Sequence, residues 1–134
     1  MQDSIFTKII RGEVSSYKVY EDDRVLAFLD IHPIQPGHTL VIPKKQVEFV
    51  WDLSDADYDD LLRVTKKVAL HLRKTLNRQY VHAKIVGTDV PHAHIHLVPF
   101  NDGDHLHVPG IENTAPDFDK LKEVHQKLGG TEWV

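Results

Sequence analysis

Three histidines alternate with small or apolar residues in the segment His92-Ala93-His94-Ile95-His96. On an extended strand, side chains two positions apart lie on the same face, so neighbouring imidazoles would stand roughly 6.6 Å apart on one side. A neutral imidazole is a competent nucleophile near neutral pH, and a second imidazole can donate a hydrogen bond to a phosphate oxygen. The row therefore favours phosphoryl chemistry through a covalent intermediate.

A metal centre is the alternative use of histidines at this spacing. Adjacent members of the row could share one ion, but a straight strand cannot bring all three to it. A third ligand would have to come from elsewhere, such as His38, His82 or His107. No Asp or Glu closely follows the row to complete a His-x-His-carboxylate set. The sequence therefore predicts no metal ligand and no cofactor, and a metal-dependent enzyme stays open as an alternative.

Composition limits the remaining classes of function. The chain has 134 residues, a formal net charge of −4 and no cysteine, so it suits a single domain over residues 1–134 without a thiolate nucleophile or a disulfide. The acidic balance argues against a nucleic-acid partner. No apolar run approaches the roughly 20 residues that cross a membrane, and the first residues lack the features of a signal peptide, so the expected compartment is the cytoplasm.

The elements that must position the histidines follow from the apolar periodicity. Residues 4–11 predict a short helix capped by Asp3 or Ser4, and residues 54–77 predict a long amphipathic helix with an acidic start and a basic end. Thr114 and Asp117 suggest a capping box for a last helix over 116–128. Strands are expected at residues 17–20, 25–29, 38–42, 80–86 and 93–100. Their hairpin-like links predict an α+β fold with an antiparallel sheet.

Several segments resemble the histidine triad (HIT) superfamily. Residues 92–98 (HAHIHLV) fit the pattern His-φ-His-φ-His-φ-φ, where φ is apolar. Residues 4–13 (SIFTKIIRGE), 20–28 (YEDDRVLAF) and 30–44 (DIHPIQPGHTLVIPK) also resemble the family, in order over about residues 4–100 and closest to its Hint-like branch. The resemblance implies a five-stranded antiparallel sheet with a long helix, a C-terminal extension with a helix over about 101–134, and a homodimer whose sheet continues to ten strands.

The resemblance also implies a catalytic role for each of four histidines. His94 would attack the α-phosphorus of a nucleoside phosphoramidate or phosphoanhydride and form a nucleotidyl-histidine, which water then hydrolyses. His96 would contact the phosphate and help the leaving group depart. His92 would orient the nucleophile, partly through its backbone carbonyl, and His38 would complete a proton relay. The implied activity is that of a nucleotide hydrolase or transferase similar to a phosphoramidase.

Other residues match the nucleotide-binding positions of the family. Asp30 would bind the ribose hydroxyls, with Ile31 beside it. The implied partner is a purine nucleotide such as AMP or its phosphoramidate. The apolar pocket that sandwiches the purine base would comprise Ile5, Phe6, Ile9 and Phe28.

Two departures from the family pattern bear on the activity. Residues 3–7 (DSIFT) stand where many members carry a Cys-x-x-Cys zinc pair, so a structural zinc is not expected. The loop over 86–91 (VGTDVP) lacks the usual Gly-Gln-Ser/Thr element, which leaves Thr88 and Asp89 as the polar side chains for the phosphate and leaving group. The alternative function is therefore a catalytically weak protein of the same fold that binds purine nucleotides or serves as a scaffold.

The C-terminal segment carries less information. His105 and His107 lie in a Gly/Asp-rich loop and are expected to be exposed to solvent, with metal binding as a minor alternative. Trp133 would either fold back onto a partner subunit or be disordered. The leaving group and the base preference are not determined by the sequence.

Overall fold

A computed structural model describes residues 2–134 and contains one antiparallel sheet with the strand order β1-β2-β3-β5-β4. The α+β fold with five strands agrees with the prediction from sequence. The strands are β1 (Lys18–Glu21), β2 (Val25–Leu29), β3 (Thr39–Pro43), β4 (Tyr80–Lys84) and β5 (Ile95–Phe100). The helices are α1 (Ile5–Ile10), α2 (Asp55–Thr75) and α3 (Phe118–Leu128), with short 3-10 turns at Val50–Asp52 and Ile111–Asn113.

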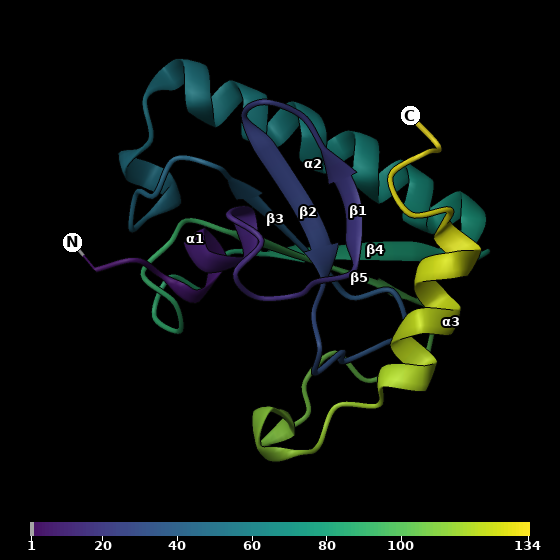
Figure 1. Cartoon of the computed structure of the whole chain (residues 1–134). Helices are drawn as coiled ribbons and strands as arrows, with labels where there is room; N and C mark the ends of the chain where they lie inside the picture. The colour runs from purple at the N-terminus through teal and green to yellow at the C-terminus, as the bar shows by residue number, and fades with distance from the viewer. Residues whose placement is uncertain (1) are drawn as a thin grey trace.

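Both faces of the sheet are covered. Figure 1 shows the long helix α2 crossing one face, α3 beside the C-terminal end of α2, and α1 against the other face. In β2, Leu26 and Phe28 pack towards α1, whereas Val25, Ala27 and Leu29 pack towards α2. Because helices cover both sides, every residue of β2 and β3 is buried, as their continuous apolar sequences require.

Helix α2 begins where the sequence predicts it. The Ser54 hydroxyl accepts a hydrogen bond from the Asp57 N–H, which satisfies one of the free donors of the first turn. The apolar stripe of α2 lies against the sheet, and Leu61, Val64 and Leu72 are fully buried there. Among the helices of residues 2–134, none is long and apolar enough to span a membrane.

The last helix starts differently from the prediction. The Asp117 carboxylate accepts a hydrogen bond from the Lys120 N–H, so Asp117 is the N-cap of α3. The predicted capping box that begins at Thr114 is therefore wrong. Thr114 instead ends the preceding 3-10 turn, and its hydroxyl donates to the Ile111 carbonyl. The helix therefore begins at Phe118 rather than at Pro116.

The strands that flank the histidine row are shorter than predicted. β4 ends at Lys84, and β5 begins at Ile95, so of the three histidines only His96 lies on a strand. The Ala93 N–H donates to the Val47 carbonyl instead of joining the ladder, which keeps the preceding residues outside the sheet. The prediction of one regular strand over 93–100 is therefore wrong at its start.

Trp133 packs on its own chain, so both expectations for this residue are wrong. Its ring stacks on the His71 ring of α2 with centroids 3.8 Å apart, and its indole N–H donates to the Val19 carbonyl at 2.7 Å. The ring nitrogen of His125 in α3 donates to the Lys18 carbonyl at 2.8 Å. These contacts attach the C-terminal segment to β1.

We expect Trp133→Ala to lower the free energy of unfolding by about 2 kcal/mol, because it removes an aromatic stack and a hydrogen bond to a buried strand. Urea unfolding followed by circular dichroism measures this change. Trp51→Ala is the matched control, since Trp51 is 70% exposed and its loss should cost less than about 0.5 kcal/mol. Equal losses in both variants would contradict the role given to Trp133.

Candidate active site

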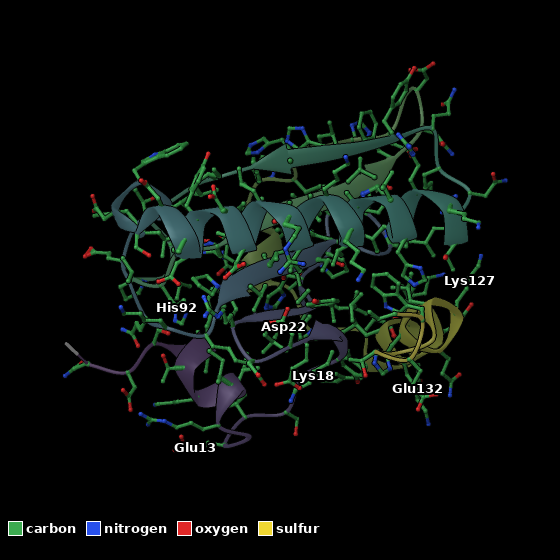
Figure 2. All side chains as sticks on the ribbon, turned by 90° about the horizontal axis from the view of Figure 1, so that it is seen from above. Glu13, Lys18, Asp22, His92, Lys127 and Glu132 are labelled. Carbon is green, nitrogen blue, oxygen red and sulfur yellow. The ribbon has the colours of Figure 1, made fainter. Side chains whose placement is uncertain are left out.

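Four histidines from distant parts of the chain meet beneath α1. His92 and His94 come from the segment before β5, His96 from β5, and His38 from the loop that enters β3. All four side chains are buried. Figure 2 shows His92 beside α1, at the edge of the sheet. The four residues to which the sequence assigns catalysis are thus brought together in space.

His92 is fixed at both ring nitrogens. Its Nε2–H donates to the Pro43 carbonyl at the end of β3, at 2.7 Å. Burial lowers the pKa of His92, so the ring is neutral and its Nδ1 accepts a hydrogen bond. The donor is the Ser4 hydroxyl at 2.8 Å, and the same hydroxyl oxygen caps α1 by accepting the Thr7 N–H. One residue therefore anchors both the first helix and the first histidine.

His94 presents a free ring nitrogen because its other nitrogen is occupied. Its Nδ1–H donates to the His92 backbone carbonyl at 2.6 Å. In a neutral ring the lone pair then resides on Nε2, which is the atom that can attack phosphorus. The Phe6 ring meets the His94 ring edge-to-face at 5.1 Å and holds its orientation.

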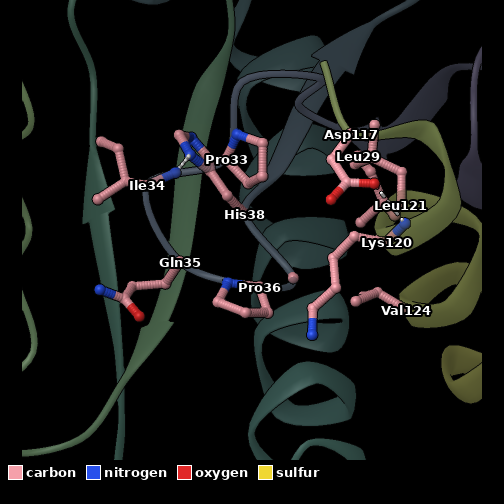
Figure 3. A pocket seen from close by; sticks show the side chains of 11 residues that line it. Leu29, Pro33, Ile34, Gln35, Pro36, His38, Asp117, Lys120, Leu121 and Val124 are labelled. Atoms are coloured by element: carbon pink, nitrogen blue, oxygen red, sulfur yellow. Dashed lines mark hydrogen bonds between the residues drawn. The ribbon is translucent and has the colours of Figure 1, made fainter. Parts of the chain in front are cut away.

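His38 and His96 form a directed chain of hydrogen bonds. The backbone N–H of Ile34 donates to His38 Nδ1 at 3.1 Å, a bond drawn in Figure 3, where the Pro33–Gly37 loop lies against α3. The proton of a neutral His38 must then be on Nε2, which donates to His96 Nδ1 at 2.9 Å. His96 in turn carries its proton on Nε2. The chain ends in an N–H group ready to donate to a ligand.

A glycine makes the loop before His38 possible. Gly37 has φ +92°, a conformation that residues with side chains rarely adopt. A Cβ at this position would also meet the side chains of Leu76 and Pro99. The close approach of the loop to the end of α2 therefore requires glycine.

Burial keeps the rings of the relay neutral. It lowers the pKa of His38 to about 3, with a further contribution from the neighbouring His96 ring. Burial likewise lowers the pKa of His96 to about 4, with a further contribution from His94. Both rings therefore carry a single proton at neutral pH. They can donate hydrogen bonds without adding positive charge to the site.

Asp89 adds a carboxylate to the histidine row. No acidic residue closely follows the row in the sequence, yet Asp89 precedes it and folds back, with Oδ1 3.1 Å from His94 Nε2 and Oδ2 3.6 Å from His96 Nε2. Burial of Asp89 opposes its charged form, but the facing His94 ring and backbone N–H groups outweigh burial and hold the pKa of this carboxyl below its ordinary value. The loop therefore supplies an ionised group next to the free nitrogen of His94.

These three side chains also have the composition of a metal site. Asp89, His94 and His96 each offer one ligand atom, and the atoms lie within 4.8 Å of one another. A transition metal needs a lone pair from each ring, however, and His96 Nε2 holds a proton as long as Nδ1 accepts from His38. Binding of an ion at this position would require the hydrogen bond between His38 and His96 to reverse its direction. The hydrogen bonding thus favours the metal-independent alternative.

A cavity of about 630 Å³ opens beside the histidines. Its size is that of a small-molecule site. One wall is apolar, and the edge-to-face pair of Phe6 and Phe28, 5.4 Å apart, lies in it. The other wall carries Asp30, His38 and His96. The cavity can thus hold a flat apolar ring and a polar tail that reaches the histidines.

Buried polar atoms without a partner point to the same cavity. Within residues 2–134, the side-chain atoms that are buried and lack a hydrogen bond are Ser16 Oγ, His32 Nδ1 and His96 Nε2. All three residues line the cavity. Buried polar groups normally have partners, so their shared position indicates a ligand with polar atoms. Burial also raises the pKa of Asp30, whose Oδ1 accepts the His32 N–H at 2.8 Å.

The remaining residues predicted to bind the nucleotide lie at the rim or in a neighbouring pocket. Ile5 and Ile31 line the cavity but are exposed, whereas Ile9 is buried in its wall. Thr88 does not line the cavity; it lies in a second pocket of about 110 Å³ that also contacts His94. His105 and His107 are exposed, as expected, and do not belong to the site.

The sequence missed several residues of the site. The sequence indicates only a helix-capping role for Ser4, because His92, whose ring contacts its hydroxyl, lies 88 residues further along the chain. Lys84 lines the cavity and supplies a positive charge, but one lysine on a strand gives no signal of this role. Ile111 and Glu112 also line it, although residues 101–134 carry no motif. Their contribution depends on how the C-terminal segment folds back.

We expect the rings of His38 and His96 to stay neutral, with the proton on Nε2, from about pH 7 to about pH 5, because both pKa values are far below the ordinary histidine value. Long-range ¹⁵N–¹H correlation spectra of the two rings test this. The exposed His107, outside the site, serves as the comparison ring in the same spectra. Protonation of either buried ring above about pH 6 would contradict the relay.

The same rings link stability to pH. The unfolded chain takes up protons at these histidines below about pH 6.5, whereas the folded chain does so only near pH 3 to 4. Their contribution to stability is therefore complete above about pH 6.5 and is lost as the pH falls towards about 4. Urea midpoints measured across this range should decrease, and the decrease should be smaller in His38→Phe. If the urea midpoint of His38→Phe falls with pH as steeply as that of the wild type, His38 is not a source of the pH dependence.

Comparison with known proteins agrees with this geometry. The chain is 45% identical to a HIT-like protein of Borreliella burgdorferi over 96% of its own length and 97% of that protein. It is 36% identical to adenosine 5′-monophosphoramidase HNT1 of Saccharomyces cerevisiae, over 92% of this chain and 79% of that protein. A crystal structure of a Hit-like protein from Bartonella henselae superimposes with a TM-score of 0.85 at 33% identity, covering 94% of this chain and 93% of that one. Residues 11–103 match the HIT domain family, and the chain therefore belongs to the HIT family.

Proposed function

We propose that this protein is a nucleotide hydrolase or transferase that cleaves nucleoside phosphoramidates or related purine nucleoside phosphoanhydrides. His94 Nε2 attacks the α-phosphorus and forms a P–N bond, while the bond from phosphorus to the leaving group breaks. Water then cleaves the nucleotidyl-histidine and releases the nucleoside monophosphate. The reaction needs no metal ion.

The observation that carries this proposal is the fixed lone pair of His94. Its Nδ1–H is held by the His92 carbonyl at 2.6 Å, so Nε2 is the nitrogen left for attack; it lies 3.2 Å from Oδ2 of Asp89, a residue that lines the cavity. The Nε2–H of His96 lies beside it without a partner and can donate to a phosphate oxygen that gains charge in the transition state. A nucleophile and an oxyanion donor are thus held close together by fixed hydrogen bonds, and only the Asp89 side chain has to move when a phosphate enters.

The cavity accounts for the nucleoside part of the substrate. A purine ring can lie against the apolar side chains of Phe6, Ile9 and Phe28, with Ile5 and Ile31 at the rim. Asp30 lies between this wall and the histidines, where its carboxylate can accept hydrogen bonds from ribose hydroxyls. The similarity to the yeast monophosphoramidase supports the same class of substrate.

We expect His94→Ala to abolish the release of AMP from adenosine 5′-phosphoramidate, because the nucleophile is lost. The wild-type protein should keep its rate in EDTA, and mass spectrometry of alkali-quenched reactions should detect an AMP adduct on His94. His107→Ala is the matched control, since this histidine is exposed and outside the site. Its rate should equal that of the wild type.

Two results would support other functions. Binding of AMP without turnover would favour the catalytically weak or scaffold alternative. Loss of turnover in EDTA that zinc restores would favour a metal-dependent enzyme built on Asp89, His94 and His96. Titration calorimetry with AMP and with Zn²⁺ separates these alternatives.

The expected homodimer and the ten-stranded sheet stay predictions. Both predictions are supported by a difference between the two edge strands of the sheet. Side chains of the C-terminal segment bond to the Lys18 and Val19 carbonyls of β1, whereas β4 forms the other edge and exposes Tyr80. An open edge strand is a site for pairing with a second copy.

Sedimentation should therefore give twice the mass of one chain. A lysine in an edge strand disfavours pairing, so Tyr80→Lys should shift the protein towards the monomer. A single-chain mass for the wild type at all concentrations would show that the dimer does not form.

A further inference from the structure

Asp89 occupies the position that the reacting phosphate must reach. Its carboxylate oxygens lie 3.1 and 3.2 Å from His94 Nε2, and one of them lies 3.6 Å from His96 Nε2. The side chain comes from the loop between β4 and β5 and is 43% exposed. It can turn aside towards solvent when a phosphate enters, while the sheet and the histidines keep their positions.

The contact between Asp89 and His94 requires a proton. His94 Nδ1–H already donates to the His92 carbonyl, so a neutral ring offers only a lone pair at Nε2. A carboxylate also offers only lone pairs. A hydrogen bond between these two groups therefore contains one additional proton, which they share. In the free protein the contact stores a proton next to the nucleophile.

The other histidines cannot supply this proton to a leaving group. His38 and His96 are neutral, and each carries the single proton that its hydrogen bonds require. The pKa values of about 3 and about 4 mean that neither ring gains a second proton at neutral pH. If His96 released its Nε2 proton, it would become an imidazolate. These rings stabilise the phosphate as hydrogen-bond donors, and the acid must be another group.

We propose that Asp89 is the general acid that protonates the leaving group, and that it makes the site selective for phosphoramidates with amine leaving groups. The inference rests on the function proposed above and decides between its two substrate classes. An amine leaves phosphorus readily only if its nitrogen receives a proton. A phosphate or nucleotide leaving group departs as an anion and needs no such proton.

Every proton that moves in the reaction cycle is accounted for. When the anionic phosphate binds, the shared proton stays on Asp89, because a nearby negative charge raises the proton affinity of a carboxylate. The Nε2 lone pair of His94 forms the bond to phosphorus. The electrons of the P–N bond to the leaving group pass to its nitrogen, which takes the proton from Asp89. In the second step Asp89 accepts a proton from water as the oxygen attacks phosphorus, and His94 leaves with its lone pair.

The second pocket at His94 is suited to an amine. It is lined by Glu48, Phe49, Trp51 and Thr88 together with His94, and none of these five residues lines the larger cavity. A carboxylate and aromatic faces attract an amine that becomes an ammonium ion. Glu48 places negative charge in this pocket, which disfavours an anionic leaving group there. The shape and the charge of this pocket thus agree with the role of Asp89.

The test compares two substrates that share the AMP moiety. One is an N-alkyl amidate of AMP, whose amine needs a proton, and the other is the p-nitrophenyl ester of AMP, whose leaving group departs as a stable anion. We expect Asp89→Asn to lower kcat/KM for the amidate by about 100-fold or more, which is the usual contribution of a general acid. The same variant should change kcat/KM for the ester by roughly threefold or less.

A third substrate and a control variant complete the design. Wild-type kcat/KM should be lower for ADP than for the amidate, and Asp89→Asn should reduce this difference because it removes the acid that only the amidate needs. Asp23→Asn removes one negative charge from an exposed site outside the cavity and should leave all three rates unchanged. Circular dichroism checks that each variant is folded.

The outcomes separate this inference from the proposed function. An equal loss for amidate and ester in Asp89→Asn, or no loss for either, would overturn the role of Asp89 and leave His94 as nucleophile. Release of AMP from neither substrate by the wild type, or full activity of His94→Ala, would refute the proposed function and this inference with it.

Discussion

The hydrogen bond from His94 Nδ1 to the His92 carbonyl is the interaction on which the site depends. It leaves Nε2 of His94, which faces Asp89, as the nitrogen that can attack phosphorus. The bond is fixed only because His92 is itself held at both ring nitrogens, by Ser4 of the first helix and by the Pro43 carbonyl of β3. Neutral, buried groups thus set the direction of every donor around the nucleophile without any formal charge.

The two faces of the sheet contribute differently. On the α2 side, a large cluster of fully buried residues from α2 and the strands gives the fold its stability. On the α1 side, the cluster around Phe6, Phe28 and Ile42 is smaller and leaves a cavity beside it. Because β2 and β3 are buried on both sides, they form a rigid support between core and cavity. The histidines therefore stand at the boundary between a close-packed region and an open one.

Much of this arrangement could be predicted from sequence because it depends on local patterns. The apolar stripe and the Ser54 cap of α2 are local patterns that predict a helix beginning at this position. The continuous apolar run Val25–Leu29 likewise predicts a buried strand. The start of β5 could not be predicted, since His92 and His94 leave the ladder only through contacts with segments far along the chain. The position of Asp89 depends on how a single loop folds back, and local periodicity carries no information on that.

The contact between Ser4 and His92 has a consequence for biosynthesis. The two residues are 88 positions apart, so the beginning of the chain leaves the ribosome long before its partner is made. At about 5–20 residues per second, the delay is roughly 4–18 s. During this time the Ser4 hydroxyl and the apolar face of α1 have no site to dock on. The nascent chain therefore cannot bind its ligand until translation is nearly finished, and its first segment is a natural client for ribosome-associated chaperones.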